Sequence, residues 1–216
     1  MGIVEIDNTK GSCLITANMI TYGNAADHPV TERIRKEIEE MWNEPAVIVT
    51  INNLQLRVQF KITAALKPSI TPEEIFADTD SANNFFRIEE FVHGNISFVD
   101  GLNSNSGYFL LENLYEGSTT AAHEFGHTLG LDHPKYLDIR GKGVPGIMYP
   151  RGTLVDPPYQ YDPQQRPGLK GGTLHPQYRR VLKEDILNLK LHRLNYRNNK
   201  AVIGAFTNVY HWDHSE

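Results

Sequence analysis

The chain has a single cysteine, Cys13, among its 216 residues. No disulfide can therefore form within it, and the fold must depend on a buried core. The apolar share of 40% is large enough to supply such a core for one domain. We interpret Cys13, in the segment Lys10–Ile15, as a buried strand residue.

Long apolar runs are also missing. No stretch approaches the roughly 18 apolar residues that span a bilayer, so we predict no membrane span. The segment Met1–Asp7 lacks a basic part followed by a long apolar run, and is not a signal peptide. The location stays open among the cytoplasm, export by a non-classical route, and a mature fragment of a secreted protein.

The chain has no strong excess of one charge. It contains 21 Lys and Arg residues against 26 Asp and Glu, which gives a formal net charge of −5. No lysine- or arginine-rich run indicates a nucleic-acid partner, and we predict none. We interpret Arg179, Arg180, Arg193 and Arg197 as the solvated face of a helix. Nothing resembles a coiled coil, so a monomer is favoured while the oligomeric state stays open.

Histidine, in contrast, is concentrated in one segment. Residues 121–134 read AAHEFGHTLGLDHP and contain the pattern H-E-x-x-H-x-x-G-x-x-H without a departure. On a helix, His123 and His127 lie one turn apart on the same face and can share one metal ion. Gly130 permits a sharp bend because it lacks a Cβ, and the bend could bring His133 back as a third ligand.

This set of residues fits a catalytic metal better than a structural one. Three neutral nitrogen ligands leave a fourth zinc position open. Zinc held by His123, His127 and His133 would acidify a bound water and polarise a carbonyl group. Glu124, next to the first ligand, could accept the proton as general base and later pass it to a leaving amine. We predict one catalytic Zn²⁺.

The eleven-residue pattern resembles the zinc signature of the metzincin clan of metalloendopeptidases. The clan has a second mark, a turn beneath the zinc that carries a methionine, and residues 146–150 with Met148 resemble this Met-turn. The Met-Tyr-Pro wording is closest to matrixins, whereas Pro134 is closer to serralysins. The resemblance covers roughly Thr119 to Pro150. It implies a zinc-dependent endopeptidase acting on a polypeptide substrate.

The resemblance also implies an architecture. It predicts an α+β fold in one catalytic domain, residues 1–216, with two lobes. The upper lobe, about residues 1–130, would hold a mixed twisted sheet and the active-site helix. The lower lobe, about residues 131–216, would be irregular and end in a C-terminal helix. Taken without the resemblance, the residues predict only the α+β class.

Candidate substrate-binding residues lie on both sides of the motif. In the clan, a strand like residues 107–112 forms the upper rim of the cleft and pairs with extended substrate, which would involve Tyr108, Phe109 and Leu110. An interior strand would explain the same residues.

After the motif, Tyr149 stands one residue before the place of the zinc-assisting tyrosine of astacins and serralysins. We therefore expect Tyr149 to line or support the pocket. Residues 150–154, beginning with Pro150 and with Tyr159 or Tyr161 nearby, could form the wall for the side chain after the cut bond. A plain surface loop is the alternative.

A second metal site is only faintly indicated. His93, Gly94 and Asn95, followed by Asp100 and Gly101, resemble the structural zinc and calcium loops of matrixins. Too few ligands are visible, so we interpret the segment as a solvated loop. A structural calcium or a second zinc has no support beyond this spacing.

The rest of the chain predicts strands mixed with helices. We expect strands at residues 14–22, 46–51, 54–65, 95–99 and 107–112, with Asn52 and Asn53 as a hairpin turn. Expected helices are residues 29–42 with Thr31 as a cap, the motif helix from Ser118 or Thr119 to Gly130, and residues 178–196. Residues 68–94 should be loop-rich with some helix near Thr71, residues 157–172 irregular, and the tail from Asn198 a short strand or a docked extension.

Two alternatives to a general endopeptidase stay open. The first is a binding module that retains zinc but cleaves nothing. The second is an effector or toxin protease that cuts one particular target, which we keep because neither an export signal nor a latency segment is visible.

Overall fold

The computed structural model describes residues 1–91 and 96–213. These residues have the expected α+β fold, in which one mixed sheet packs against helices. The strands are β1 (Gly2–Asp7), β2 (Ser12–Tyr22), β3 (Ile48–Ile51), β4 (Leu54–Leu66), β5 (Asn83–Glu89), β6 (Phe98–Val99), β7 (Ser106–Leu110) and β8 (Lys200–Ile203). The α-helices are α1 (His28–Asn43), α2 (Pro72–Phe76), α3 (Thr120–Thr128) and α4 (Lys183–Asn188). Short 3₁₀ turns are η1 (Leu111–Leu114), η2 (Pro157–Tyr159), η3 (Pro176–Tyr178) and η4 (Leu191–Arg193).

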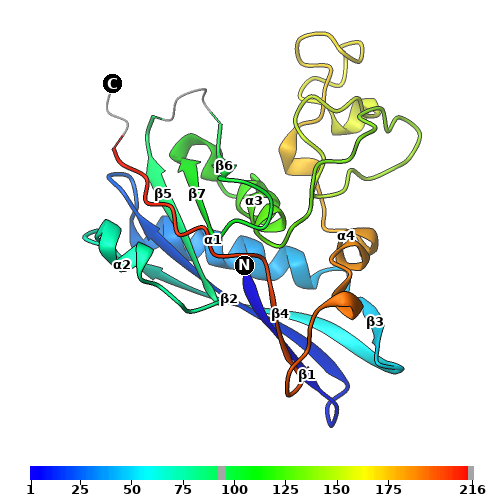
Figure 1. The fold of residues 1–216 in the computed structure, drawn as a ribbon. Helices are drawn as coiled ribbons and strands as arrows, with labels where there is room; N and C mark the ends of the chain where they lie inside the picture. The colour runs from blue at the N-terminus through cyan, green and yellow to red at the C-terminus, as the bar shows by residue number, and fades with distance from the viewer. Residues whose placement is uncertain (92–95, 214–216) are drawn as a thin grey trace.

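The sheet has the strand order β3-β4-β2-β5-β7-β6. β4 runs parallel to β2 along one side, while β1 and then β5 share its other side. β8 pairs with β1 and so joins the C-terminal part of the chain to the sheet. At the other edge, β6 pairs antiparallel with β7. Figure 1 shows α1 running along one face of the sheet, with α3 on the same side.

The hairpin and the alternation predicted for β3 and β4 are confirmed. Asn52 and Asn53 both have positive φ, 51° and 64°, which suits the two central positions of a tight hairpin turn. Along β4, the apolar residues alternate with exposed polar ones and point into the core. Cys13 is buried in β2 as expected, and burial raises the pKa of its thiol to about 11.

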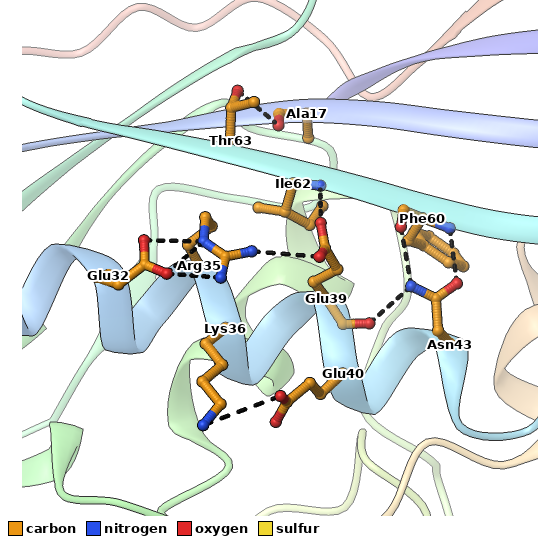
Figure 2. A network of polar contacts seen from close by, with 10 residues as sticks. All are labelled: Ala17, Glu32, Arg35, Lys36, Glu39, Glu40, Asn43, Phe60, Ile62 and Thr63. Carbon is orange, nitrogen blue, oxygen red and sulfur yellow. Dashed lines mark hydrogen bonds and ion pairs between the residues drawn. The ribbon is translucent and has the colours of Figure 1, made fainter.

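Helix α1 also closes an open edge of the sheet. β3 covers only the first residues of β4, so the next backbone groups of β4 need other partners. The Asn43 side chain accepts a hydrogen bond from Phe60 N (2.9 Å) and donates one to Phe60 O (2.8 Å). Glu39 accepts from Ile62 N at 2.7 Å, and Arg35 holds Glu39 in place (Figure 2). Side chains of α1 therefore act as a substitute strand.

The cap of α1 differs from the prediction. Asp27, not Thr31, is the N-cap residue, and its carboxylate accepts a hydrogen bond from Val30 N at 2.7 Å. Thr31 lies one turn inside the helix, where its buried hydroxyl donates to Asp27 O and contacts the Thr21 hydroxyl. The prediction erred by one turn because both Asp and Thr are good cap residues.

Two strands lie where the sequence predicted none. β5 falls within the segment expected to be loop-rich, yet it pairs with β2 and β7 in the middle of the sheet. Its residues are buried along nearly its whole length, so it lacks the alternation that identified β4. β1 begins at Gly2 and was likewise not recognised as a strand.

The long C-terminal helix predicted over residues 178–196 is wrong. Only α4, six residues long, is helical there, with 3₁₀ turns before and after it. Asp185 accepts a hydrogen bond from Leu182 N at 2.7 Å and so starts α4 late. Lys190 has a left-handed backbone with φ 52°, which interrupts the helix early. The apolar residues of this segment reach the core from turns as well as from a helix face.

Residues 131–182 connect α3 to α4 by a long irregular path, which stands apart from the sheet in Figure 1. A small apolar cluster of Ile139, Val155 and Leu174 holds it together. Isolated bridges, such as the one between Asp138 and Leu154, add backbone hydrogen bonds. The irregular segment predicted at residues 157–172 is thus confirmed. The tail strand is confirmed as β8, and no helix in the described residues is both long and apolar enough to cross a bilayer.

Candidate metal centre and cleft

Helix α3 carries the histidine motif and is capped by another helix. Its N-cap residue is Thr119, as predicted, but that side chain makes no capping hydrogen bond. Instead the Glu37 carboxylate, which comes from α1, accepts hydrogen bonds from Thr119 N (3.3 Å), Ser118 Oγ (3.3 Å) and Ala122 N (3.2 Å). A carboxylate at the positive end of a helix is favourable. α1 therefore fixes the start of the motif helix.

The other end of α3 turns sharply at Gly130, as the motif predicts. Gly130 has φ +92°, and its amide bonds to His127 O while the Leu131 amide bonds to Gly126 O, both at 3.0 Å. This is the hydrogen-bond pattern of a glycine-terminated helix. A Cβ at Gly130 would also collide with the Asn103 side chain. The turn directs the next residues back toward the helix.

The three predicted ligands come together. His133 Nε2 lies 3.1 Å from His123 Nε2 and 3.1 Å from His127 Nε2. Nitrogen ligands about 2.0–2.1 Å from a zinc ion at tetrahedral angles would be about 3.3 Å apart, which is close to these distances. Among the residues that the structure describes, this is the only cluster of at least three His, Cys, Asp or Glu side chains suited to a metal ion.

Hydrogen bonds fix the protonation of two of the rings. His123 Nδ1 lies 2.7 Å from Ile147 O, and His127 Nδ1 lies 2.7 Å from Leu131 O. A carbonyl oxygen only accepts, so both Nδ1 atoms must carry hydrogen. Each Nε2 then presents a lone pair toward His133. Lone pairs that converge in this way repel one another unless a cation lies between them, so the three rings fit a metal ion.

Burial keeps the rings neutral. It lowers the pKa of His123 well below its usual value, and the positive charge of Arg179 adds to this effect. Burial likewise lowers the pKa values of His127 and His133. Neutral imidazole is the form that binds a metal.

The predicted Met-turn residue lies directly beneath α3. Met148 is buried, and its sulfur packs so closely on Gly126 that a Cβ there would collide with it. Tyr149 N bonds to Gly146 O at 3.2 Å, which closes the turn around Met148. The same turn supplies Ile147 O to His123. The turn therefore contacts both the helix backbone and one of the three histidines.

Glu124 lines a cleft of about 510 Å³ together with the three histidines. Its carboxylate makes no hydrogen bond or ion pair with any residue in the described ranges, and burial raises its pKa to about 8. The charges of Arg179 and Arg151 act in the opposite direction on that pKa. The motif thus places a carboxyl group of raised proton affinity beside the converging nitrogens.

The strand expected at the rim of the cleft is an interior strand. Residues Tyr108, Phe109 and Leu110 of β7 are buried, and none of them lines the cleft. β7 is paired with β5 on one side and with β6 on the other. The rim is formed instead by residues 96–99, which include β6. Of the strand expected over residues 95–99, the described residues 96–99 form a strand only at Phe98–Val99.

After the motif, Pro150 lines the cleft together with Arg151 and Gly152. Tyr149 does not line it, and packs against the apolar cluster of Ile139, Val155 and Leu174. Tyr159 joins the same cluster. Neither Tyr159 nor Tyr161 is among the residues that line the cleft.

Arg179 is a cleft residue that the sequence did not reveal. We interpreted it as solvated, but it is only 4% exposed and lines the cleft. Its Nε donates to Thr119 Oγ1 at 2.9 Å, across 60 positions of sequence. Burial lowers the pKa of its guanidinium to about 10, so it remains charged near neutral pH. No local pattern around residue 179 indicates this contact.

The faint second metal site lies only partly within the described residues. His93, Gly94 and Asn95 lie outside the described residues. Asp100 forms an ion pair with His211, with its Oδ1 2.9 Å from Nε2. That part of the predicted loop therefore already has a protein partner.

Comparisons with known proteins give a distant likeness. Two solved structures align with the chain over most of its length, each at 11% sequence identity. Archaemetzincin from Methanopyrus kandleri has a TM-score of 0.41, with 82% of this chain and 95% of that chain covered. Myroilysin has a TM-score of 0.40, with 83% and 94% covered. No family model matches the chain, and neither does any curated protein. Function must therefore be argued from the residues of the site.

Proposed function

We propose that the chain is a zinc-dependent endopeptidase in which His123, His127 and His133 hold the metal and Glu124 is the general base. The observation that carries the proposal is the convergence of three Nε2 atoms next to a carboxyl group that faces an open cleft. A structural zinc site has four protein ligands. Here the described residues supply three nitrogen ligands, and Glu124 is not among them. Its carboxyl group can therefore act as a general base.

In this proposal, the metal, Glu124 and two backbone carbonyls have separate roles in hydrolysis. A zinc ion, when bound, supplies Lewis acidity that polarises the scissile carbonyl group and makes water more acidic. Glu124 accepts the proton of the attacking water at its carboxylate and later donates it to the leaving amine. The backbone carbonyls of Ile147 and Leu131 hold His123 and His127 in the correct tautomer.

The same cleft suggests roles for the residues around the metal site. Met148 acts as the methionine of a Met-turn and keeps Ile147 O against His123. Pro150, Arg151 and Gly152 form the wall for the residue after the cut bond, and Tyr149 supports that wall from behind. Residues 96–99 are the edge along which an extended polypeptide binds. We propose one catalytic domain over residues 1–216, with lobes that meet near residue 130, acting as a monomer.

The experiment is a digest of a peptide library by the zinc-loaded chain, read by mass spectrometry. Cleavage should disappear on treatment with a chelator and return with zinc. His133→Ala should abolish cleavage, whereas His192→Ala, an exposed histidine outside the cluster, should leave it unchanged. Bound zinc without any cleavage would favour a binding module. Cleavage that survives His133→Ala would overturn the proposed metal site.

A further inference from the structure

Arg179 is a buried charge that no carboxylate contacts within ion-pair distance, although Glu124 and Glu37 lie near enough to favour its charged form. Its side chain is 4% exposed and forms no ion pair with any residue in the described parts of the chain. A buried charge is costly unless it is paired and hydrogen-bonded. Within the fold, the other buried arginine, Arg87, is paired with Glu89 at 2.5 Å. Arg179 therefore differs from Arg87, because its charge is free to pair with an anion that enters the cleft.

The structure holds its guanidinium in one orientation. Nε donates to Thr119 Oγ1 at 2.9 Å, and Nη1 donates to Tyr149 O at 3.3 Å. Thr119 Oγ1 donates in turn to Pro176 O at 2.8 Å. Nη2 has no hydrogen bond to a described residue, and Arg179 lines the cleft. A preorganised fork loses little entropy when it binds a planar carboxylate.

A second guanidinium lines the same cleft. Arg151 lines the cleft, is exposed, and donates from Nη2 to Asn113 Oδ1 at 2.6 Å. With Glu124 as the only carboxylate that lines the cleft, the described lining residues have an excess of positive charge. Such a cleft favours a substrate that carries negative charge.

The chemistry of the proposed function places this charge on one side of the cut bond. Glu124 must hand its proton to the leaving amine, so the residue that carries this amine lies against Glu124. Arg179 and Arg151 line the same cleft as Glu124. Arg151 belongs to the wall of residues 150–152, and Arg179 Nη1 donates to Tyr149 O, next to that wall. The two guanidiniums therefore lie on the leaving-amine side.

We propose that Arg179, supported by Arg151, binds a carboxylate of the substrate on the C-terminal side of the scissile bond. This inference rests on the proposed endopeptidase function and names its substrate class. The carboxylate belongs either to an Asp or Glu side chain after the cut bond or to a nearby chain terminus, and the two sources share the same recognition chemistry. Arg179 is thus a specificity-determining residue.

The test uses two pairs of peptides built on a cleavage site found in the library digest. In the first pair, with amidated C-termini, the residue after the cut bond is Glu or its uncharged isostere Gln. In the second pair this residue is Gln and is also the last one, with a free or an amidated C-terminus. In at least one pair, we expect kcat/KM to be about tenfold or more higher for the peptide that carries the carboxylate than for its uncharged partner. Hydrogen bonds to charged groups are strong enough to give such a difference. The first pair reports a side chain and the second a chain terminus.

Variants of two adjacent arginines separate specificity from general damage. Arg179→Gln should reduce the preference for the charged peptide to less than about threefold in kcat/KM. The same variant should lower kcat/KM for the uncharged peptides much less than for the charged ones. Arg179→Lys should restore part of the preference because it keeps the charge but not the fork. Arg180→Gln is the matched control, since Arg180 is exposed and does not line the cleft. It should keep the wild-type preference.

A binding measurement gives a readout without turnover. The cleavage products of both peptide pairs are titrated into the wild-type and Arg179→Gln chains. The first pair gives product peptides that begin with Glu or Gln, and the second gives a single Gln residue with a free or an amidated C-terminus. The acid preferred in the kinetic test should bind wild type at least about tenfold more tightly than its uncharged partner, and this difference should vanish in Arg179→Gln.

The outcomes distinguish the two levels of the proposal. If the wild-type chain cuts peptides but neither pair shows a preference, or if Arg179→Gln keeps it, the role of Arg179 is wrong and the endopeptidase stands. If the zinc-loaded chain cuts no peptide, both proposals fail. If Arg179→Gln does not fold, Arg179→Lys takes its place in both measurements. The inference is overturned if Arg179→Lys keeps the wild-type preference in kcat/KM and if the wild-type chain binds the charged and the uncharged product equally well.

Discussion

At the scale of single residues, the histidine motif predicts its own geometry because its parts are close in sequence. The helix sets His123 and His127 one turn apart, and Gly130 turns the chain so that His133 returns to them. Arg179 shows the limit of such inference. Its burial depends on Thr119, which is distant in sequence, and nothing near residue 179 records that contact.

Gly130→Ala tests the turn. The substitution puts a Cβ on a residue with φ +92° and against the Asn103 side chain, so we expect a loss of stability of about 2 kcal/mol. Zinc affinity should also fall at least about tenfold, because the turn positions both Leu131 O and His133. Urea unfolding and a competitive zinc titration measure the two effects.

Gly101→Ala is the control for this substitution. Gly101 has no positive φ, and a Cβ there meets nothing within 4 Å. Its stability and its zinc affinity should match those of the wild type. If Gly130→Ala behaves like this control, the turn does not determine where His133 lies.

At the scale of elements, the strands with one exposed face were predictable and the fully buried ones were not. The alternation of β4 predicts a strand correctly, whereas β5 is buried on both faces and its sequence predicts a loop. The segment after Tyr178 failed for a different reason. Apolar residues at helical spacing predicted one long helix, but capping by Asp185 and the left-handed Lys190 reduce it to six residues.

Asn43→Ala tests the side-chain edge that α1 provides to β4. The change leaves Phe60 N and Phe60 O without their partners, so we expect a loss of about 2 kcal/mol in the free energy of unfolding. Glu40→Ala, on the exposed side of the same helix, should cost less than about 0.5 kcal/mol. Chemical denaturation of both variants measures the difference. Equal losses would show that the two hydrogen bonds between Asn43 and Phe60 add nothing measurable to the free energy of unfolding.

Asp185 gives α4 a dependence on pH. Burial raises the pKa of its carboxyl group from 3.8 to about 6, so the folded chain favours the protonated form. The resulting stability is present below about pH 4 and is lost as the pH rises through about 6. Asp185→Asn removes this titration. Relative to that variant, the wild type should lose on the order of 2 kcal/mol between pH 4 and pH 7.

Urea unfolding of both chains at several pH values measures this loss. Lys183→Gln changes the charge of the same helix but keeps Asp185, and its difference from wild type should stay constant with pH. A constant difference for Asp185→Asn as well would show that its carboxyl group is not perturbed in the fold.

At the scale of the whole molecule, the cleft joins parts of the chain that the sequence could not bring together. Its rim comes from residues 96–99, its floor from α3, and its far wall from Pro150, Gly152 and Arg179. The motif alone predicted that the three histidines converge. The walls, which would set substrate choice, depend on how the long segment after Gly130 brings residues 150–152 and Arg179 to the cleft.

Zinc should stabilise this whole arrangement. Since the ion binds the folded chain through residues on both sides of the turn, zinc at about 100 times its dissociation constant should add about 2.7 kcal/mol. For a chain of this size, that corresponds to a rise in Tm of about 5–10 °C. Differential scanning calorimetry with zinc and with chelator measures the shift. His127→Ala should lose it, and an equal shift in that variant would place the bound zinc elsewhere.

The most direct test of the central claim compares wild type with Glu124→Gln on one peptide substrate, with the zinc content of both samples measured in parallel. Because Glu124 handles protons but is not a ligand, both chains should bind one zinc per chain, while the variant loses at least about 100-fold in rate. A Glu124→Gln chain that holds its zinc and cleaves at the wild-type rate would contradict the account.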